Sequence, residues 1–230
     1  MLHLLMNCTS MTRVLIADDH PLFRNALKTA LQACIPDSDV LECEDLDRTR
    51  KSLSESAPVD LLLLDLHMPG SNGLAGLAGI RCGHPEVAVV VVSANEDPAV
   101  IRRALDYGAA GFIPKSSGLD VLTDAVNAVL DCRTWMPPHL HRAVQATQSQ
   151  DGELAERIAR LTPQQFRVLE MVADGALNKQ IADRLGIRER TVKAHMSEIF
   201  GKLEVRNRTQ AGVAFRRLEL RDPAAIRDGK

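Results

Sequence analysis

The sequence predicts a doubly wound α/β domain with a five-stranded parallel sheet, followed by a small all-α domain. Three observations support this prediction: short apolar runs that are continuous rather than alternating, helical apolar stripes between them, and a second group of helices after a polar stretch. Continuous apolar strands are typical of parallel sheets, because such strands are covered on both faces. A chain of 230 residues is also long enough for two domains.

The strands of the first domain are expected at residues 14–17, 40–43, 61–64, 87–92 and 111–113, of which the second is the weakest run. Helices are expected between them. One apolar stripe begins after Pro21 and another lies near the end of the domain; their members are Phe23, Ala26, Leu27, Ala30, Leu31 and Cys34, and Leu122, Ala125, Val126, Val129 and Leu130. Strands that alternate with helices predict a doubly wound fold.

The helical pattern stops near Asp131, and Pro137-Pro138 and the polar string QATQSQDGE follow. We interpret this stretch as a linker. The first domain is therefore placed at residues 11–132, the linker at 133–160 and the second domain at 161–220. Charge divides in a similar way. Residues 1–160 carry 14 Lys and Arg against 21 Asp and Glu, a net charge of −7, whereas residues 161–230 carry 14 against 9, a net charge of +5. This asymmetry favours cation or phosphate chemistry in the first domain and a polyanionic partner for the second.

The five cysteines show no C-x-x-C spacing, so the sequence indicates neither a zinc site nor a disulfide framework. We interpret them as small buried hydrophobes in a reducing compartment. No apolar run approaches the roughly 20 residues that a membrane-spanning helix needs, and the opening MLHLLMNCTS does not resemble a secretion signal. We expect a cytoplasmic protein with no membrane partner. Residues 1–10 are interpreted as a disordered extension or as the result of an upstream start.

Reactive side chains stand where the predicted strands end. Asp18 and Asp19 follow the first strand, Asp65 ends the third, Ser93 follows the fourth and Lys115 follows the fifth. Ligands bind at this edge of open α/β sheets, so these residues are expected to share one pocket. Clustered carboxylates repel each other and are stable together mainly around a hard cation, which indicates Mg²⁺. One carboxylate can then attack a phosphoryl group while Mg²⁺ and Lys115 neutralise its oxygens.

Each of these residues also has an ordinary structural explanation. An Asp pair or a Ser after a strand often caps a helix, and a surface Lys is usually solvated. Several such residue types on successive strand ends are harder to explain as caps alone.

Four strings, VLIADDHPLFR, LLLLDLHMPGSNG, VVVVSANED and YGAAGFIPKS, resemble in order and spacing the receiver domains of two-component response regulators, over roughly residues 11–132. The resemblance implies that Asp65 is the phosphoacceptor, and that Asp18, Asp19, Asp65 and the main-chain carbonyl of His67 hold Mg²⁺. It implies that Ser93 and Lys115 bind the phosphoryl group and that Ser93 and Phe112 act as the switch pair. A plain core position is the alternative for Phe112, and Tyr107 and Trp135 are interpreted as packing residues.

The second domain is expected to begin at Thr162, with Pro163 at the first helical position and Gln165 completing a capping box. Ile181, Ala182 and Leu185 indicate a short helix, and Gly186 a turn. A longer helix follows; its inner stripe is Val192, Met196, Ile199 and Leu203, and its outer face is Arg190, Lys193, Ala194, Ser197 and Gly201. This pattern fits a helix-turn-helix, although a helical bundle with a solvated charged face fits the periodicity nearly as well. Asn207 and Gln210 are expected to cap a fourth helix.

The string N-K-x-I-A-x-x-L-G-I followed by T-V-K-x-H resembles the LuxR-type DNA-binding domain of NarL/FixJ regulators, over about residues 161–220. The resemblance implies that Lys193, Ala194 and Ser197 face bases and that Lys179, Arg190 and Thr191 face phosphates. The chain departs from the family pattern at four positions. These are Gln165 and Gln180 in place of Glu, Leu177 in place of a capping Ser or Thr, and Arg188 in place of a capping Ser. These four substitutions are expected to weaken the helix caps and to leave the fold of the domain unchanged.

Together the two resemblances imply a response regulator whose DNA binding and transcriptional control depend on phosphorylation of Asp65 by a sensor histidine kinase. They imply double-stranded DNA and a second copy of the chain, in a homodimer favoured by phosphorylation, as partners, and no enzymatic turnover. An aspartyl-nucleophile, Mg²⁺-dependent phosphatase is one alternative, but it needs D-x-D after the first strand, where this chain has Asp18-Asp19-His20. An RNA- or single-strand-binding regulator is another, but aromatic residues are only 3% of the chain and form no stacking ladder.

Overall fold

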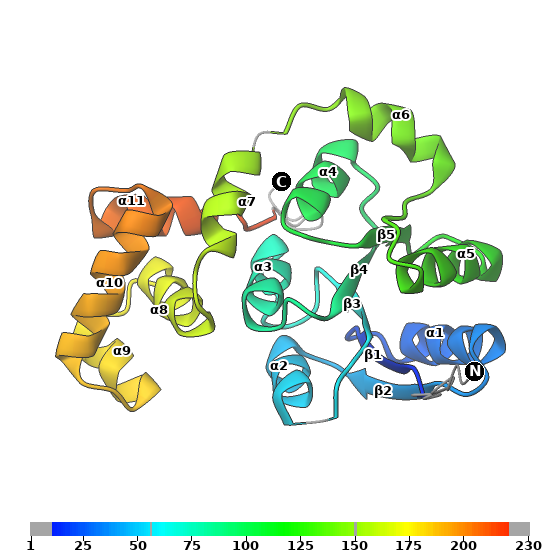
Figure 1. Cartoon of the computed structure of the whole chain (residues 1–230), viewed down its shortest axis with the longest axis horizontal. Coiled ribbons are helices and arrows are strands. Elements are labelled where there is room, and N and C mark those ends of the chain that lie inside the picture. The colour runs from blue at the N-terminus through cyan, green and yellow to red at the C-terminus, as the bar shows by residue number, and fades with distance from the viewer. Residues whose placement is uncertain (1–10, 56, 150, 221–230) are drawn as a thin grey trace, which may run out of the picture.

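The computed structural model describes residues 11–55, 57–149 and 151–220, so the interpretation of residues 1–10 lies outside the described residues. In the described part of the chain, five parallel strands form one sheet in the order β2-β1-β3-β4-β5 (Figure 1). The strands are β1 (Arg13–Ala17), β2 (Asp39–Cys43), β3 (Leu61–Asp65), β4 (Ala88–Ser93) and β5 (Gly111–Pro114). The predicted fold class is confirmed, and each expected strand is present with its ends shifted by one residue at most.

Strands β1, β3, β4 and β5 are largely buried because both faces of the sheet are covered, whereas only Cys43 is buried in the edge strand β2. Leu61 and Leu63 of β3 face one core, which includes Leu31 of α1 and Val126 of α5. Leu62 and Leu64 face the other core, which includes residues of α2, α3 and α4. The five helices are α1 (Pro21–Cys34), α2 (Leu46–Glu55), α3 (Leu74–Gly83), α4 (Pro98–Asp106) and α5 (Leu119–Leu130). The predicted stripe on α1 is wrong at Ala26, which is exposed, whereas Leu27 and Ala30 are buried.

The second domain consists of four short helices, α8 (Pro163–Ala173), α9 (Asn178–Leu185), α10 (Glu189–Leu203) and α11 (Arg208–Arg216). Its helix ends follow the predicted signals. Thr162 and Gln165 form the expected capping box, and Asn207 accepts a hydrogen bond from Gln210 N over 2.9 Å. Gly186 ends α9 with φ +63°, a left-handed conformation that glycine adopts without strain.

Two further helices lie within the linker, α6 (Pro138–Ala146) and α7 (Gly152–Ala159). The chain first returns to the sheet at Trp135, whose main-chain N donates to Ala110 O over 3.0 Å and whose O accepts from Phe112 N over 2.9 Å. Helix α6 then packs on α4, and α7 packs on both α3 and α10. Most of the linker is therefore ordered helix held against the first domain.

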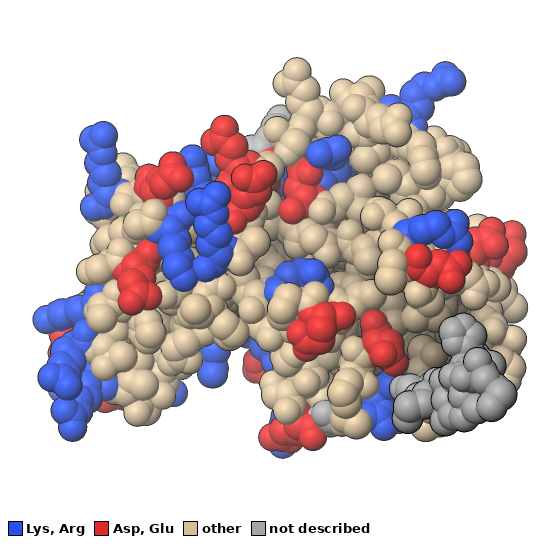
Figure 2. Space-filling model, viewed as in Figure 1, with Lys and Arg blue, Asp and Glu red and all other residues tan. Residues whose placement is uncertain are grey.

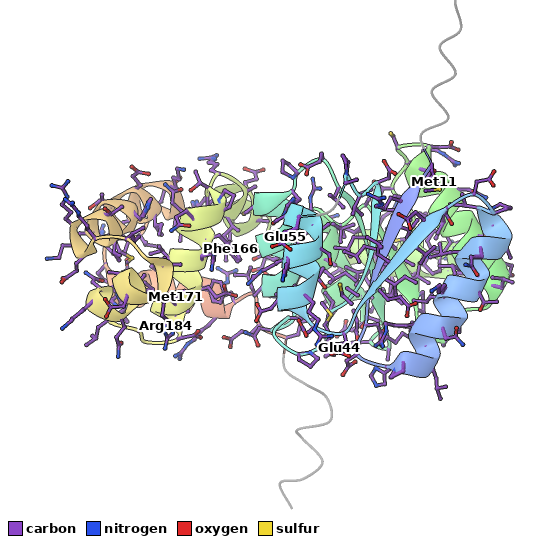
Figure 3. The ribbon with its side chains drawn as sticks, turned by 90° about the horizontal axis from the view of Figure 1, so that it is seen from below. Met11, Glu44, Glu55, Phe166, Met171 and Arg184 are labelled. Carbon is purple, nitrogen blue, oxygen red and sulfur yellow. The ribbon has the colours of Figure 1, made fainter. Side chains whose placement is uncertain are left out.

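The two domains meet through α3 and α4 on one side and α7, α8 and the end of α11 on the other (Figure 1). A single buried apolar cluster extends across the contact and includes Leu77 of α3 and Phe166 of α8. In Figure 3 Phe166 lies on the side of the second domain that faces the first, whereas Arg184 lies farther away. Arg50 of α2 and Glu170 of α8 form an ion pair of 3.3 Å across the same boundary.

Among the described cysteines only Cys43 is buried, so the interpretation of all of them as buried hydrophobes is wrong. Cys132 is exposed because it lies in the turn after α5, where its φ is +59°. None of the described helices combines the length and the apolar character needed to cross a bilayer.

Candidate functional site

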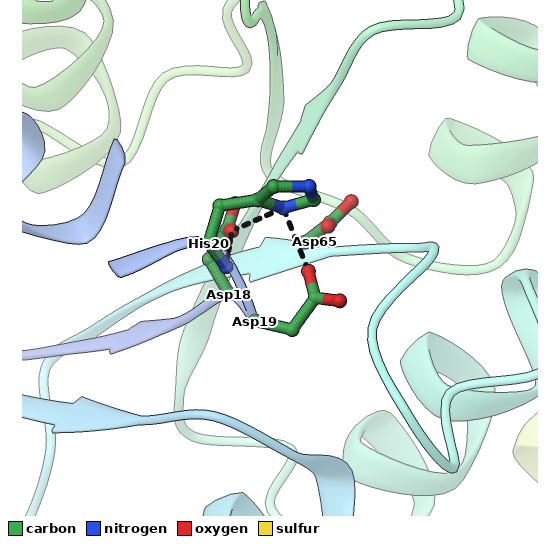
Figure 4. Close-up of side chains that lie close together, drawn as sticks. All are labelled: Asp18, Asp19, His20 and Asp65. Carbon is green, nitrogen blue, oxygen red and sulfur yellow. Dashed lines mark hydrogen bonds and ion pairs between the residues drawn. The ribbon is translucent and has the colours of Figure 1, made fainter. Parts of the chain in front are cut away.

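The acidic side chains at the strand ends converge on one pocket, as the sequence predicts. Asp18 and Asp65 are each 1% exposed, and Asp19, which is more accessible, lies beside them. Figure 4 shows Asp18, Asp19 and Asp65 grouped at the ends of β1 and β3 together with His20. Oxygen atoms of the three carboxylates and a ring nitrogen of His20 all lie within 4.8 Å of one another.

Lys115 supplies the positive charge in the pocket. Its Nζ lies 2.8 Å from Asp65 Oδ2 and 2.6 Å from Asp18 Oδ2, and it also lies 5.0 Å above the centre of the Phe23 ring. Burial lowers the pKa of Lys115, but hydrogen bonding to Asp18 and Asp65 outweighs that effect, so the pKa is raised above its ordinary value. The side chain is therefore an ammonium that bridges two carboxylates at neutral pH.

The pocket fits a hard divalent cation. Asp19 Oδ1 is a buried oxygen that accepts no hydrogen bond within the described structure and lies 2.7 Å from His20 Nδ1, whereas Asp18 Oδ2 is held by Lys115 Nζ at 2.6 Å. Buried carboxylate oxygens without hydrogen bonds are what an oxygen-seeking cation such as Mg²⁺ would coordinate. A cation here would compete with Lys115 for Asp18 and Asp65.

His20 is a pocket residue that sequence reasoning missed. Its Nδ1 lies 2.7 Å from Asp19 Oδ1 and 3.2 Å from Asp18 Oδ1, while 67% of its side chain is exposed (Figure 4). The sequence feature that could have indicated this role is the position of His20 directly after Asp18 and Asp19. His67 contacts Asp65 mainly through its main chain, since His67 N donates to Asp65 Oδ1 over 3.1 Å while its ring Nδ1 lies 3.9 Å from the same oxygen.

Ser93 and Phe112 occupy the two neighbouring strands at this edge. Ser93 is fully buried, and its Oγ accepts a hydrogen bond from Asn95 N over 3.1 Å. Its carbonyl oxygen accepts from Lys115 N over 2.8 Å, which ties the end of β4 to the residue after β5. Phe112 is also fully buried, in the apolar cluster that contains Ile101 and Ala104 of α4.

Apolar side chains surround the mouth of the pocket. A cavity of about 570 Å³ opens beside Asp65 and is lined by Leu22, Phe23 and Ala26 as well as Lys115. Leu22, at this opening, is 88% exposed. The exposed Ala26 is explained by this opening, because it lines the cavity rather than the core.

The outer face of α10 is open to solvent. Its members Arg190, Lys193, Ala194 and Ser197 are all exposed, whereas Val192, Met196, Ile199 and Leu203 are buried. Lys179 at the start of α9 is exposed and Thr191 is half-buried. Figure 2 shows Lys and Arg side chains gathered at the left edge of the molecule, over the region of α9 and α10. A helix with an exposed basic face has the dimensions and charge to enter a DNA major groove.

Neither α9 nor α10 has a side-chain cap at its N-terminus. Leu177 and Arg188 precede these helices and make no side-chain capping bond, although Gln180 Oε1 accepts from Leu177 N over 2.7 Å. Leu177 and Arg188 are two of the four positions at which the sequence departs from the family pattern.

Comparison with known protein families and structures agrees with both halves of this description. Residues 14–127 match the response regulator receiver domain, and residues 159–215 match the bacterial regulatory proteins of the luxR family. A glycerol metabolism activator from Pseudomonas putida is 45% identical over 206 residues, which cover 87% of this chain and 93% of that protein. The nitrate/nitrite response regulator NarL of Escherichia coli K12 is 32% identical over 201 residues, with the same two coverages.

Solved structures of RcsB are similar over both domains. RcsB from Salmonella enterica serovar Typhimurium, bound to the promoter rprA in the presence of the phosphomimetic BeF₃⁻, is 25% identical with a TM-score of 0.53, covering 90% of this chain and 97% of that one. An RcsB–DNA complex gives 25% identity and a TM-score of 0.55, with the same coverages.

The fold and the two matched domains define a transcriptional response regulator with a receiver domain and a LuxR-type helix-turn-helix. The chain belongs to the NarL/FixJ family of response regulators. The phosphatase and RNA-binding alternatives are not favoured, because the relatives are transcriptional regulators and the similar structures include DNA complexes.

Proposed function

We propose that Asp65 accepts a phosphoryl group from a sensor histidine kinase and that the modification controls DNA binding by α10. The observation that carries this proposal is the geometry at Asp65: a buried carboxylate at the end of a central strand, 2.8 Å from the ammonium of Lys115. We retain the division into a receiver at residues 11–132, a linker at 133–160 and a DNA-binding domain at 161–220.

In the proposed reaction an Asp65 carboxylate oxygen attacks phosphorus, the bond to the donor breaks, and an acyl phosphate forms on Asp65. Asp18, Asp19, Asp65 and the His67 carbonyl would hold Mg²⁺, which supplies positive charge next to the transferred group. Lys115 leaves Asp18 to pair with a phosphoryl oxygen, and Ser93 Oγ donates to another. The modified residue is a regulatory mark, so we expect no sustained turnover.

The switch would pass through α4. When Ser93 Oγ donates to the phosphoryl group, its side chain would turn toward Asp65, and the segment that leads into α4, which is tied to Ser93 Oγ through Asn95 N, would move with it. Phe112 packs beneath α4 and would change position with it. We propose that this change favours a homodimer, in which two α10 helices read half-sites about one helical turn, about 10 base pairs, apart.

The test of the phosphoacceptor is intact-mass measurement after incubation with acetyl phosphate and Mg²⁺. The wild-type chain should gain one phosphoryl group, and Asp65→Asn should gain none. Asp60→Asn is a matched control, since Asp60 precedes the same strand but is exposed. Phosphorylation of Asp65→Asn would show that another residue is the acceptor.

A protein donor docked at the pocket could contact the exposed Leu22, whereas a small phosphodonor needs only the polar groups around Asp65. Leu22→Asp should be phosphorylated by acetyl phosphate at the wild-type rate and by its kinase more slowly. Equal slowing by both donors would mean that Leu22 supports the pocket rather than the partner.

A further inference from the structure

The ring of His20 lies in the acidic pocket and is placed there by a fixed main chain. His20 N donates to Asp18 Oδ1 over 2.8 Å, and His20 O accepts from Arg24 N over 3.0 Å in the first turn of α1. His20 is the N-cap residue of α1, directly before Pro21, yet its side chain forms no capping hydrogen bond. The ring therefore does not stabilise the helix end and lies against the carboxylates instead (Figure 4).

The contact between His20 and Asp19 is close but is not a hydrogen bond. His20 Nδ1 lies 2.7 Å from Asp19 Oδ1, and this buried oxygen accepts no hydrogen bond within the described structure. A buried oxygen without a hydrogen bond is unusual in folded proteins. Imidazole nitrogens and carboxylate oxygens are both common metal ligands, so a cation bound by the two atoms together would satisfy this oxygen.

The same ring nitrogen lies within reach of the carboxylates on both strands. One oxygen from each of Asp18, Asp19 and Asp65 and a ring nitrogen of His20 all lie within 4.8 Å of one another. Protein ligands bind a first-row ion such as Zn²⁺ at about 2.0–2.2 Å, so ligands on opposite sides of it lie about 4.0–4.4 Å apart. Small side-chain movements would therefore let all four groups bind one ion. Among the described residues, the ring of His67 is outside this group.

A nitrogen ligand changes which cations the pocket prefers. Mg²⁺ prefers oxygen ligands and keeps several of its waters, so an imidazole adds little to its binding. Imidazole suits transition ions, whose affinity for a given site rises from Mn²⁺ through Co²⁺ to Cu²⁺. The three carboxylates and the ammonium of Lys115 leave two negative charges, which a divalent cation balances. A neutral imidazole adds a ligand atom without changing that balance.

We infer that His20 is a metal ligand of this pocket and that it shifts the preference of the pocket from Mg²⁺ toward transition ions such as Mn²⁺ and Co²⁺. The inference rests on the proposed function, in which the same pocket holds a divalent cation, and adds which ions it accepts. Because the side chain of His20 is 67% exposed, an ion can reach its ring from solvent without rearrangement of the core.

The first experiment titrates Mg²⁺, Mn²⁺ and Co²⁺ into the full chain by isothermal calorimetry, without a phosphodonor, for wild type and His20→Ala. The ratio of Co²⁺ affinity to Mg²⁺ affinity should fall about 10- to 100-fold in the variant, since removal even of a group that only orients a metal ligand has an effect of this size. His84→Ala is the matched control, because the ring of His84 lies 3.5 Å from Glu86, outside the pocket.

An unchanged ratio would overturn the inference in either of two ways. If all three ions bind His20→Ala as tightly as wild type, the ring does not contact the cation. If all three bind more weakly by the same factor, His20 only positions Asp19. Mg²⁺ binding that is retained in His20→Ala shows that the variant is folded.

The second experiment uses pulsed electron paramagnetic resonance of Mn²⁺ bound to the full chain and measures nitrogen hyperfine coupling. Wild type and His84→Ala should show the coupling of a directly bound ring nitrogen, and His20→Ala should not. Coupling that persists in His20→Ala and disappears in His67→Ala would assign the nitrogen to His67 and overturn the inference.

Failure of the inference can be distinguished from failure of the proposed function. If wild type binds Mg²⁺ and gains a phosphoryl group on Asp65, but His20→Ala shows no selective loss of Co²⁺ and Mn²⁺, only the inference is wrong. If wild type binds none of the three ions, the proposed cation site is wrong as well.

Discussion

Lys115 Nζ lies 2.8 Å from Oδ2 of the buried Asp65 carboxylate. The same ammonium contacts Asp18, so it neutralises the pocket while no cation is bound. A ligand that bound Asp18 Oδ2 or Asp65 Oδ2 would compete with Lys115 for that oxygen.

Lys115→Met should lower the free energy of unfolding by about 1–3 kcal/mol without Mg²⁺, because two buried carboxylates lose their charged donor. Mg²⁺ should raise the Tm of this variant more than that of wild type, since Lys115 no longer competes for the oxygens. Thermal melts with and without Mg²⁺ test this, with Lys28→Met, at an exposed ion pair to Glu42, as the control. An equal Mg²⁺ effect in both chains would show that the ion binds elsewhere.

The contribution of Lys115 to stability should also depend on pH. Its pKa in the folded chain is raised above the ordinary value of 10.5, so the stabilisation is complete below that pH and is lost as pH rises through the folded pKa. The difference in unfolding free energy between wild type and Lys115→Met should be constant from neutral pH up to the ordinary value and should decrease above it. A difference that fell between pH 6 and 8 would point to another group.

Gly79→Ala should destabilise the docked domains. A Cβ at Gly79 would lie 2.8 Å from Phe166 Cε1 and 2.9 Å from Arg50 Nη2, and such overpacking costs about 1–3 kcal/mol. Gly83→Ala is the matched control on the same helix, because its Cβ would meet nothing within 4 Å. That change should alter stability by less than about 0.5 kcal/mol, because Gly83 is the last residue of α3 and its surroundings are open. Equal Tm values for the two variants would contradict the close contact at Gly79.

Cys82 should react slowly with alkylating reagents. Burial raises the pKa of its thiol from 9.0 to about 11, and its Sγ donates to Ile158 O of α7 over 3.3 Å. A shift of this size leaves roughly 100-fold less thiolate at pH 8, and thiolate is the reactive form. Peptide mapping after timed alkylation should find exposed Cys132 modified well before Cys82. Comparable rates would mean that the interdomain contact opens readily.

Lys193→Ala separates two roles for the basic face of α10. If Lys193 reads a base, the change should cost roughly 1–3 kcal/mol on a selected operator and little on scrambled duplex. If it contacts phosphate, affinity should fall evenly on both duplexes and the salt dependence should decrease. Titrations at two salt concentrations distinguish these cases, and Ser197→Ala should mainly change the preference among sites. Binding unaffected by either variant would exclude this face as the reading surface.

The sequence predicted the pocket well because strand ends in a parallel sheet meet at one edge. Asp18, Asp65, Ser93 and Lys115 could be placed from the apolar runs that precede them, with no knowledge of side-chain conformations. The contact of His20 with both carboxylates was not predictable in the same way, since it depends on the rotamer of an exposed ring.

The contacts between the two domains could not be predicted from the local sequence pattern. Asp151 lies in a polar string that resembles a flexible linker, and nothing nearby indicates that its carboxylate meets Arg103, 48 residues away in sequence. The linker helix α7 was missed for a related reason: it is short, and its apolar residues Leu154 and Ile158 gain their stability from packing in the core.

Trp135, where the chain returns to β5, is an intrinsic fluorescence probe of this part of the protein. Trp135 is the single tryptophan in the sequence, and its main chain is bonded on both sides to the strand that carries Phe112. Its fluorescence therefore reports on one junction, where the sheet passes into the linker, and carries almost no direct signal from residues 161–220. Fluorescence emission would follow unfolding around Trp135, whereas far-ultraviolet circular dichroism would follow the secondary structure of the whole chain. Coincident denaturation curves would mean that the two domains unfold together, and separated curves would mean that they do not.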